Sequence, residues 1–214
     1  MLGAPLRRIL FRPNPKPISG RLPERNLPVT VCIGAISHPM VIIATDRMIT
    51  SSDIQFEQQQ PKIFQLTNNC VALVSGDLAL QAELVDETRW RLTQSGVKRI
   101  KEITAAFADA YAAYCERKAA AEVLKPLGVI SVEDLLRRKW PAEVVSKILH
   151  QLRQASYDDN VGTIIAGTDE YGPHLSVVER PGTYSIQDRI GFSSVGIGRR
   201  HAESQFMLAG YTPA

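Results

Sequence analysis

The chain has 214 residues, of which 44% are hydrophobic and 22% are charged, a composition typical of one globular domain or of one domain with an appendage. No stretch approaches the roughly 18 consecutive apolar residues of a membrane-spanning helix, so we expect a soluble protein without a membrane partner. The net charge of +3 arises from residues 1–29, which hold six basic residues against one acidic residue, and this argues against a nucleic-acid-binding surface on the rest of the chain.

Residues 1–29 differ from the rest of the chain. They hold six of the 13 prolines and no sustained apolar period. Such a segment cannot bury enough surface to offset its ordering entropy, so we expect a disordered leader. It lacks the apolar core of a secretory signal, and its single serine, Ser19, makes it a poor organelle transit peptide.

Short β-rich runs begin after Thr30. Residues 31–36 and 41–45 predict one hairpin, and residues 62–66 and 70–75 predict a second. Because these runs are nearly continuously apolar, we expect a sheet that is covered on both faces.

Helical periodicity follows at residues 78–94 and in an alanine-rich stretch at 97–124. Residues 131–156 predict two further short helices, with a break where Pro141 follows Trp140.

Strands return near the end of the chain, before a last helix predicted at 200–208. The four predicted strands are residues 162–168, 174–179, 183–186 and 191–195. This order of strands, helices, strands and helix is typical of α+β layers over an antiparallel sheet rather than of strict βα alternation.

The three cysteines show neither CxxC nor Cys/His spacing. An odd count argues against a disulfide framework and structural zinc, and it favours a reducing compartment such as the cytoplasm. We expect the three to be small buried hydrophobes: Cys32, Cys70 and Cys115. The four histidines are scattered, and we expect them to face solvent: His38, His150, His174 and His201. No metal or organic cofactor is implied.

Four short motifs follow a fixed spacing in the first half of the chain. They are Thr30-Val-Cys-Ile, Val41-Ile-Ile-Ala-Thr-Asp46, Pro61-Lys62-Ile-Phe and Leu73-Val-Ser-Gly76. These motifs resemble the opening half of proteasome β subunits and of the bacterial ATP-dependent protease HslV, in which the mature chain begins at a threonine. That family has an aspartate, a lysine and a glycine 16, 32 and 46 positions later, and counting from Thr30 gives Asp46, Lys62 and Gly76.

The resemblance implies a fold and a domain organisation. The fold is an α+β four-layer αββα sandwich of the N-terminal nucleophile hydrolase type, C-terminally short, over residues 30–214. Residues 1–29 are then a leader, a propeptide or the product of a mis-assigned start. A helical insertion is expected near 129–158, where the chain is longer than the family segment. Family members also continue with an aspartate and a serine that orient the threonine, to which nothing here can be matched, and Ile197 replaces the serine of their Gly-Ser-Gly turn.

The chemistry of such a site explains its residue types. A threonine hydroxyl needs a base, and the α-amine of an N-terminal threonine, with an ordinary pKa of ~8, can take its proton. An ammonium such as that of Lys62 would depress the pKa of this amine and favour the alkoxide, and Asp46 would hold the ammonium in place. The backbone N–H of Gly76 could donate to the oxyanion, since glycine permits close approach.

Each of these residues also has a structural interpretation. Asp46 and Lys62 are compatible with an ordinary surface ion pair, Thr30 with a β-former that opens a strand, and Gly76 with a turn glycine. While 29 residues precede it, the nitrogen of Thr30 is an amide and cannot act as a base. Family members expose the threonine by autocleavage, usually after glycine, or by removal of an initiator methionine. Here Val29 precedes Thr30, and a GUG start codon at Val29 is a further hypothesis.

Residue-by-residue transfer from the family also gives a substrate pocket. Its expected walls are Ile49, Gln60, Phe64, Val74, Leu78 and Ala82, and Thr50 with Gly76 would hold the substrate backbone as an added strand. These mostly apolar walls predict cleavage of peptide or protein substrates after hydrophobic residues. The resemblance implies a homo-oligomeric ring, with an ATPase as a possible partner. Two alternatives remain, a catalytically silent structural subunit and, on the leader alone, a basic-arm nucleic-acid binder.

Overall fold

The computed structural model describes residues 30–46, 48–51, 54–57, 61–156 and 161–213. The predicted leader and Gln60 lie outside these ranges. Within them, the strands form a three-stranded sheet, a two-stranded hairpin and a five-stranded sheet, and all neighbouring strands are antiparallel. None of the described helices is both long enough and apolar enough to cross a membrane.

The three-stranded sheet joins the two ends of the described chain. Its strands, in spatial order, are β10 (Phe192–Val195), β1 (Cys32–Ser37) and β2 (Met40–Thr45). The predicted hairpin at the start of the chain is confirmed, with bounds that differ by one residue. Because β1 pairs with both neighbours, the residues just before β1 and just after β2 lie at the same end of this sheet.

The five-stranded sheet combines the middle and the later part of the chain. Its order is β5 (Ile63–Thr67), β6 (Cys70–Ser75), β7 (Gly162–Asp169), β8 (Gly172–Glu179) and β9 (Thr183–Ile186). All five strands were predicted from their apolar runs. The hairpin of β3 (Met48–Ser51) and β4 (Ile54–Glu57) was not predicted.

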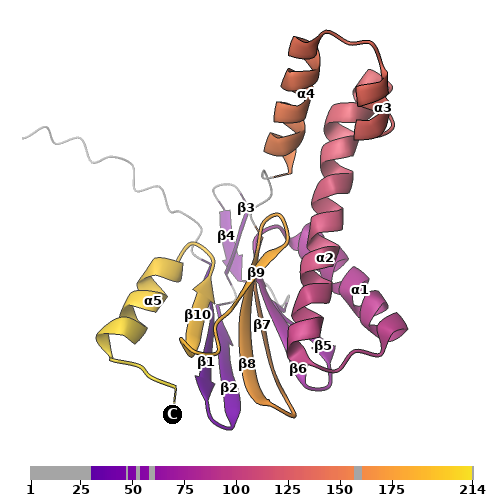
Figure 1. The fold of residues 1–214 in the computed structure, drawn as a ribbon. Helices are drawn as coiled ribbons and strands as arrows, with labels where there is room; N and C mark the ends of the chain where they lie inside the picture. Colours follow the sequence, from indigo (N-terminus) through magenta and orange to yellow (C-terminus); the bar gives the residue numbers. More distant parts are fainter. Residues whose placement is uncertain (1–29, 47, 52–53, 58–60, 157–160, 214) are drawn as a thin grey trace, which may run out of the picture.

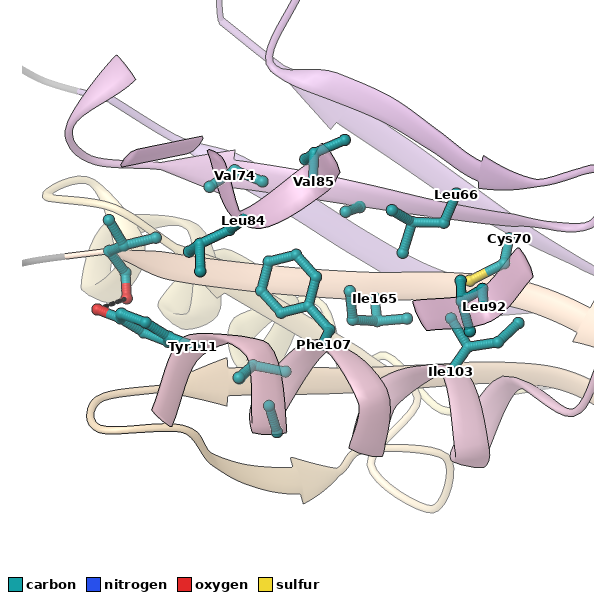
Figure 2. Close-up of a cluster of buried hydrophobic side chains, with 14 of the residues drawn as sticks. Leu66, Cys70, Val74, Leu84, Val85, Leu92, Ile103, Phe107, Tyr111 and Ile165 are labelled. Carbon is teal, nitrogen blue, oxygen red and sulfur yellow. Dashed lines mark hydrogen bonds between the residues drawn. The ribbon is translucent and has the colours of Figure 1, made fainter. Parts of the chain in front are cut away.

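Two long helices, α1 (Leu78–Ser95) and α2 (Ile100–Ala119), cover one face of the five-stranded sheet. Figure 2 shows the resulting cluster, in which Phe107 and Tyr111 of α2 point towards the sheet and have no exposed surface. Burial of each such side chain contributes about 1.5–3 kcal/mol. The hydroxyl of Tyr111 donates to the carbonyl oxygen of Val161 at 3.4 Å, which ties α2 to the start of β7.

The opposite face of the five-stranded sheet packs against the three-stranded sheet. Ile36 of β1 meets Leu73, Ile164 and Leu175 in this second cluster. The contact is close, because a Cβ added to Gly34 would lie 2.6 Å from Leu175 Cδ1. The two faces of β6 therefore belong to two different clusters, which confirms the predicted cover on both faces for β5 and β6. The prediction of one such sheet for all four runs is wrong, because β1 and β2 lie in the three-stranded sheet, where one face of β2 is exposed.

A helical arm leaves the sheets between α2 and β7 (Figure 1). A π-helical turn (Ala120–Leu124) and a 3-10 turn (Lys125–Leu127) extend α2, and α3 (Val132–Arg137) and α4 (Ala142–Ala155) complete the arm. It has its own small apolar cluster, with Leu124, Val129, Leu135 and Ile148 at the centre. The two short helices and the break at Trp140 and Pro141 agree with the sequence.

The last helix, α5 (Arg199–Leu208), lies beside the three-stranded sheet. Phe206 stacks on Phe192 of β10 with ring centroids 4.7 Å apart. Further along the same sheet, Met40 and Ile42 of β2 are 57% and 56% exposed. The described residues therefore form a mixed α and β structure with two antiparallel sheets, in which helices cover the outer face of the five-stranded sheet.

Candidate active site

The predicted residues come from the same end of both sheets. Thr30 directly precedes β1 and Asp46 directly follows β2, in the three-stranded sheet. Lys62 directly precedes β5, and its carbonyl oxygen accepts the Val74 N–H at 2.9 Å, which places it beside the end of β6 that leads to Gly76. The geometry of this site thus depends on how the two sheets pack.

The side chains of Thr30, Asp46 and Lys62 meet in one hydrogen-bonded group. The Lys62 Nζ donates to Thr30 Oγ1 at 3.4 Å and forms an ion pair with Asp46 Oδ1. The second carboxylate oxygen of Asp46 accepts the Val31 N–H at 2.9 Å, and the Asp46 N–H donates to the Val31 carbonyl oxygen at 3.2 Å. Asp46 therefore holds both the ammonium and the start of β1.

Because Lys62 is buried, the ion pair also matters for the stability of the fold. The Lys62 side chain is only 5% exposed and that of Asp46 is 27% exposed. A buried ammonium without a partner is strongly destabilising, because its lost hydration is not replaced. Asp46 replaces part of that hydration and orients the ammonium towards Thr30.

Cys32 lies next to this group but differs from it chemically. It is fully buried, and its Sγ lies 3.3 Å from Thr45 Oγ1. Burial raises the pKa of the Cys32 thiol, although the nearby Lys62 ammonium and the Thr45 hydrogen bond act in the opposite direction. Cys32 has no exposed surface through which a substrate could reach it, whereas Thr30 is partly exposed, so Thr30 is the better candidate. Cys70 and Cys115 are also buried, as predicted, and neither forms a disulfide within the described residues.

The turn after β10 supports the main chain of Thr30. The Gly198 N–H donates to the Thr30 carbonyl oxygen at 3.3 Å. Gly196 has a φ of +97°, and a Cβ at this position would lie 2.2 Å from the same oxygen. Only glycine fits so close an approach in this conformation. The sequence indicated a turn here but not that the turn contacts the Thr30 main chain. The two glycines directly after a strand could have indicated such a close approach. Ile197, between the two glycines, is 55% exposed.

Gly76 lies where β6 ends and α1 begins. Its φ of +128° is a conformation that favours glycine. The next residue, Asp77, caps α1 by accepting the N–H groups of Ala79 and Leu80 at 2.8 and 3.1 Å. The Gln81 side chain, which sequence analysis did not single out, donates through Nε2 to the Gly76 carbonyl oxygen at 3.0 Å. The backbone at Gly76 is thus held in place at the positive end of a helix.

The predicted pocket residues do not form one described surface. Val74 is fully buried under the helices, Phe64 is half-buried against the same cluster, and Ala82 is exposed on α1. Ile49 and Thr50 lie in β3 and Leu78 begins α1, and the structure describes their backbone only. The substrate pocket therefore remains a prediction.

One prediction about the histidines is wrong. His174 does not face solvent, because Asp188 Oδ2 lies 2.7 Å from its Nδ1 and Asp169 Oδ1 lies 3.0 Å from its Nε2. The strand register places His174 at the end of the sheet away from Gly76. Across the described ranges, His, Cys, Asp and Glu side chains form no group of three or more that could hold a metal ion.

Comparison with known proteins agrees with this arrangement. Residues 29–133 match the family model described as Proteasome subunit, and the match includes Thr30, Asp46, Lys62 and Gly76. No curated protein matches the chain. The matched residues run from β1 through α2 into the arm, and they include the strands and the helix that flank these four residues. Residues 29–133 are therefore similar to the proteasome subunit family.

Proposed function

We propose that this protein is a threonine-type peptidase or amidohydrolase in which Thr30 becomes the N-terminal residue and attacks peptide bonds. The observation that supports this most strongly is the position of the Lys62 ammonium, between Thr30 Oγ1 at 3.4 Å and the Asp46 carboxylate. An ordinary surface ion pair would be exposed, whereas this lysine is 5% exposed and contacts a hydroxyl. A buried cation beside a hydroxyl stabilises the developing alkoxide.

The proposed reaction proceeds in two steps. In the first, Thr30 Oγ1 attacks the carbonyl carbon while its proton passes to the free Thr30 amine, directly or through a water. The carbonyl electron pair moves onto oxygen, and its return expels the leaving amine, which takes up that proton. The resulting ester on Thr30 is then hydrolysed by water, which releases the acid and restores the hydroxyl.

The oxyanion of the first step would lie at the start of α1. The Gly76 N–H is the proposed donor, and the positive end of the helix macrodipole adds to its effect. Removal of one such donor typically lowers the rate by about 10²–10³-fold.

The remaining family properties form part of the same proposal. They comprise a four-layer αββα sandwich over residues 30–214 with a helical insertion near 129–158, assembly of several copies into a ring, and a cytoplasmic location. The proposed substrates are peptides or proteins cleaved after hydrophobic residues, and the proposed pocket walls are mostly apolar. An ATPase partner is compatible with the family but is not required by the site.

The amino end of the chain provides the decisive test. Until the bond between Val29 and Thr30 is cut, the Thr30 nitrogen is an amide and the proposed base does not exist. Intact-mass measurement of protein made from the native gene should therefore give the mass of a chain that begins at Thr30. A mass that retains all 29 preceding residues would contradict the proposal.

Covalent labelling tests the nucleophile itself. A peptide epoxyketone needs both the hydroxyl and the free amine of one threonine, so protein that begins at Thr30 should be labelled once per chain. Thr30→Ala should abolish labelling, whereas Thr30→Ser retains a hydroxyl and should keep it. Equal labelling of the alanine variant would rule out Thr30 as the nucleophile.

A catalytically silent structural subunit is the second candidate. Ile197 supports it, because this exposed apolar residue stands where the family resemblance places a serine that contacts the threonine. Assembly into rings by protein that begins at Thr30 but takes no label would favour this candidate. Native mass spectrometry measures the ring, and the probe measures the label on the same sample.

A further inference from the structure

We infer that Gln81 is a positioning residue that holds the oxyanion-donating backbone of Gly76 in place. This inference rests on the proposed function. Gln81 lies in the first turns of α1 and is only 1% exposed, and its Nε2 donates to the Gly76 carbonyl oxygen at 3.0 Å. A side chain of the helix thus reaches back to the residue whose N–H is the proposed donor.

Gly76 needs such a restraint because of its own conformation. Gly76 has no side chain, so its backbone is freer than that of other residues and can adopt the observed φ of +128°. Before it, Ser75 pairs with Gly162 in the sheet, and after it, Asp77 caps α1. The Gln81 bond restrains the Gly76 carbonyl between these two anchors. The N–H and the C=O of Gly76 lie in two adjacent peptide planes, which only φ and ψ of Gly76 connect. Because Ser75 is anchored in the sheet, a hydrogen bond to the carbonyl narrows the range of these two angles and so the direction of the N–H.

The chemistry of Gln81 indicates that packing alone does not explain this residue. Within the described residues, nothing donates to its buried Oε1. Burial of an amide with one end unpaired costs free energy, and an unbranched apolar side chain of similar size would avoid that cost. An apolar side chain could not donate a hydrogen bond to the Gly76 carbonyl oxygen, as Gln81 does.

The inference is tested with Gln81→Met in the full chain, and Thr88→Val serves as the control. Methionine keeps the length and the helix propensity of glutamine but lacks its donor. Thr88 is a fully buried polar residue of the same helix whose hydroxyl donates to the Leu84 carbonyl oxygen at 2.7 Å, away from Gly76. Valine keeps the shape of this side chain and removes the helix back-bond.

Two measurements separate positioning from stability. Amide hydrogen exchange of the peptide that spans residues 75–80 reports the order of the Gly76 backbone, and it requires no activity. The inactivation constants of the epoxyketone report reaction and binding separately. In Gln81→Met we expect faster exchange in this peptide, an inactivation rate constant lower by about tenfold with an unchanged inhibition constant, and an unchanged or higher Tm. Thr88→Val should leave both the exchange and the rate constant unchanged.

Each alternative result has one meaning. Unchanged exchange in Gln81→Met overturns the inference, and so does faster exchange with a wild-type inactivation rate. If the inactivation rate constant falls together with the Tm in Gln81→Met, and the same happens in Thr88→Val, then Gln81 has a structural role only. This result also overturns the inference. If the wild-type chain takes no label while Gln81→Met speeds the exchange, the proposed function fails and the hold of Gln81 on Gly76 stands.

Discussion

Asp46 accepts the backbone N–H of Val31 through Oδ2 at 2.9 Å while its Oδ1 pairs with the buried ammonium of Lys62. The two interactions use both oxygens of one carboxylate. They connect the residue after the candidate nucleophile to the cation that contacts its hydroxyl. Stability and reactivity therefore depend on the same side chain, which makes the pair testable by a mutant cycle.

Asp46→Asn should destabilise the protein by about 3 kcal/mol, because it removes the carboxylate charge that pairs with the 5% exposed Lys62 ammonium. Asp46→Asn combined with Lys62→Met removes the buried charge as well and should recover most of that loss. Neither variant should react with the epoxyketone. Denaturant unfolding measures the two free energies, and a double variant as unstable as Asp46→Asn alone would contradict this account.

Gly196→Ala should be more destabilising than Gly172→Ala, by about 1–3 kcal/mol. Both glycines have positive φ values, +97° and +114°, so the backbone strain is similar. A Cβ at Gly172 meets nothing within 4 Å, whereas one at Gly196 would lie 2.2 Å from the Thr30 carbonyl oxygen. We also expect loss of labelling only in Gly196→Ala. Equal unfolding free energies for the two variants would show that the close approach does not matter.

His174 should make the stability of the protein depend on pH. Burial alone lowers its pKa, but hydrogen bonds and attraction from Asp188 and Asp169 outweigh burial, so the pKa of His174 is raised above its ordinary value of 6.5. A raised pKa means that the stabilisation is complete below about pH 6.5 and is lost as the pH rises through the folded-state pKa. His174→Gln should remove this loss.

The measurement for His174 compares Tm at about pH 6 and about pH 8.5. The wild-type Tm should fall more between these values than that of His174→Gln. His150→Gln is the matched control, because His150 is exposed on α4. A wild-type decrease equal to that of His174→Gln would exclude His174 as the titrating group.

The cysteines should be inert in the folded protein. Burial raises the pKa of Cys70 to about 12 and also raises that of Cys32, so both stay protonated at neutral pH. Iodoacetamide should modify neither residue until the protein is unfolded, which peptide mass mapping detects. Cys32→Ala should keep the epoxyketone label, and loss of the label in this variant with an unchanged Tm would point to Cys32 as the nucleophile.

Long apolar runs and helical periods predicted most elements to within a few residues. The hairpin of β3 and β4 was not predicted, because each strand has only four residues and no glycine or proline separates them. Short strands of this kind carry a weak local signal.

His174 and Gln81 show a different limit. A histidine in a strand and a glutamine in a helix carry no sign of their partners, because histidine is often partly buried and glutamine is ordinarily a surface residue. Asp169 and Gly76 lie only five residues from His174 and Gln81, and the backbone turns between them bring each pair together, whereas Asp188 reaches His174 from fourteen residues further along the chain. Burial, which decides the strength of these contacts, is absent from local sequence.

By itself the sequence determined the identity and spacing of Thr30, Asp46, Lys62 and Gly76, and the family resemblance singled them out as candidate site residues. The tertiary structure decided that three of their side chains touch, that Cys32 is shielded, and that the Gly196 turn supports Thr30. The physical reason is that Thr30 and Asp46 extend from one sheet and Lys62 and Gly76 from the other. Contact between them depends on packing between layers, which no local pattern encodes.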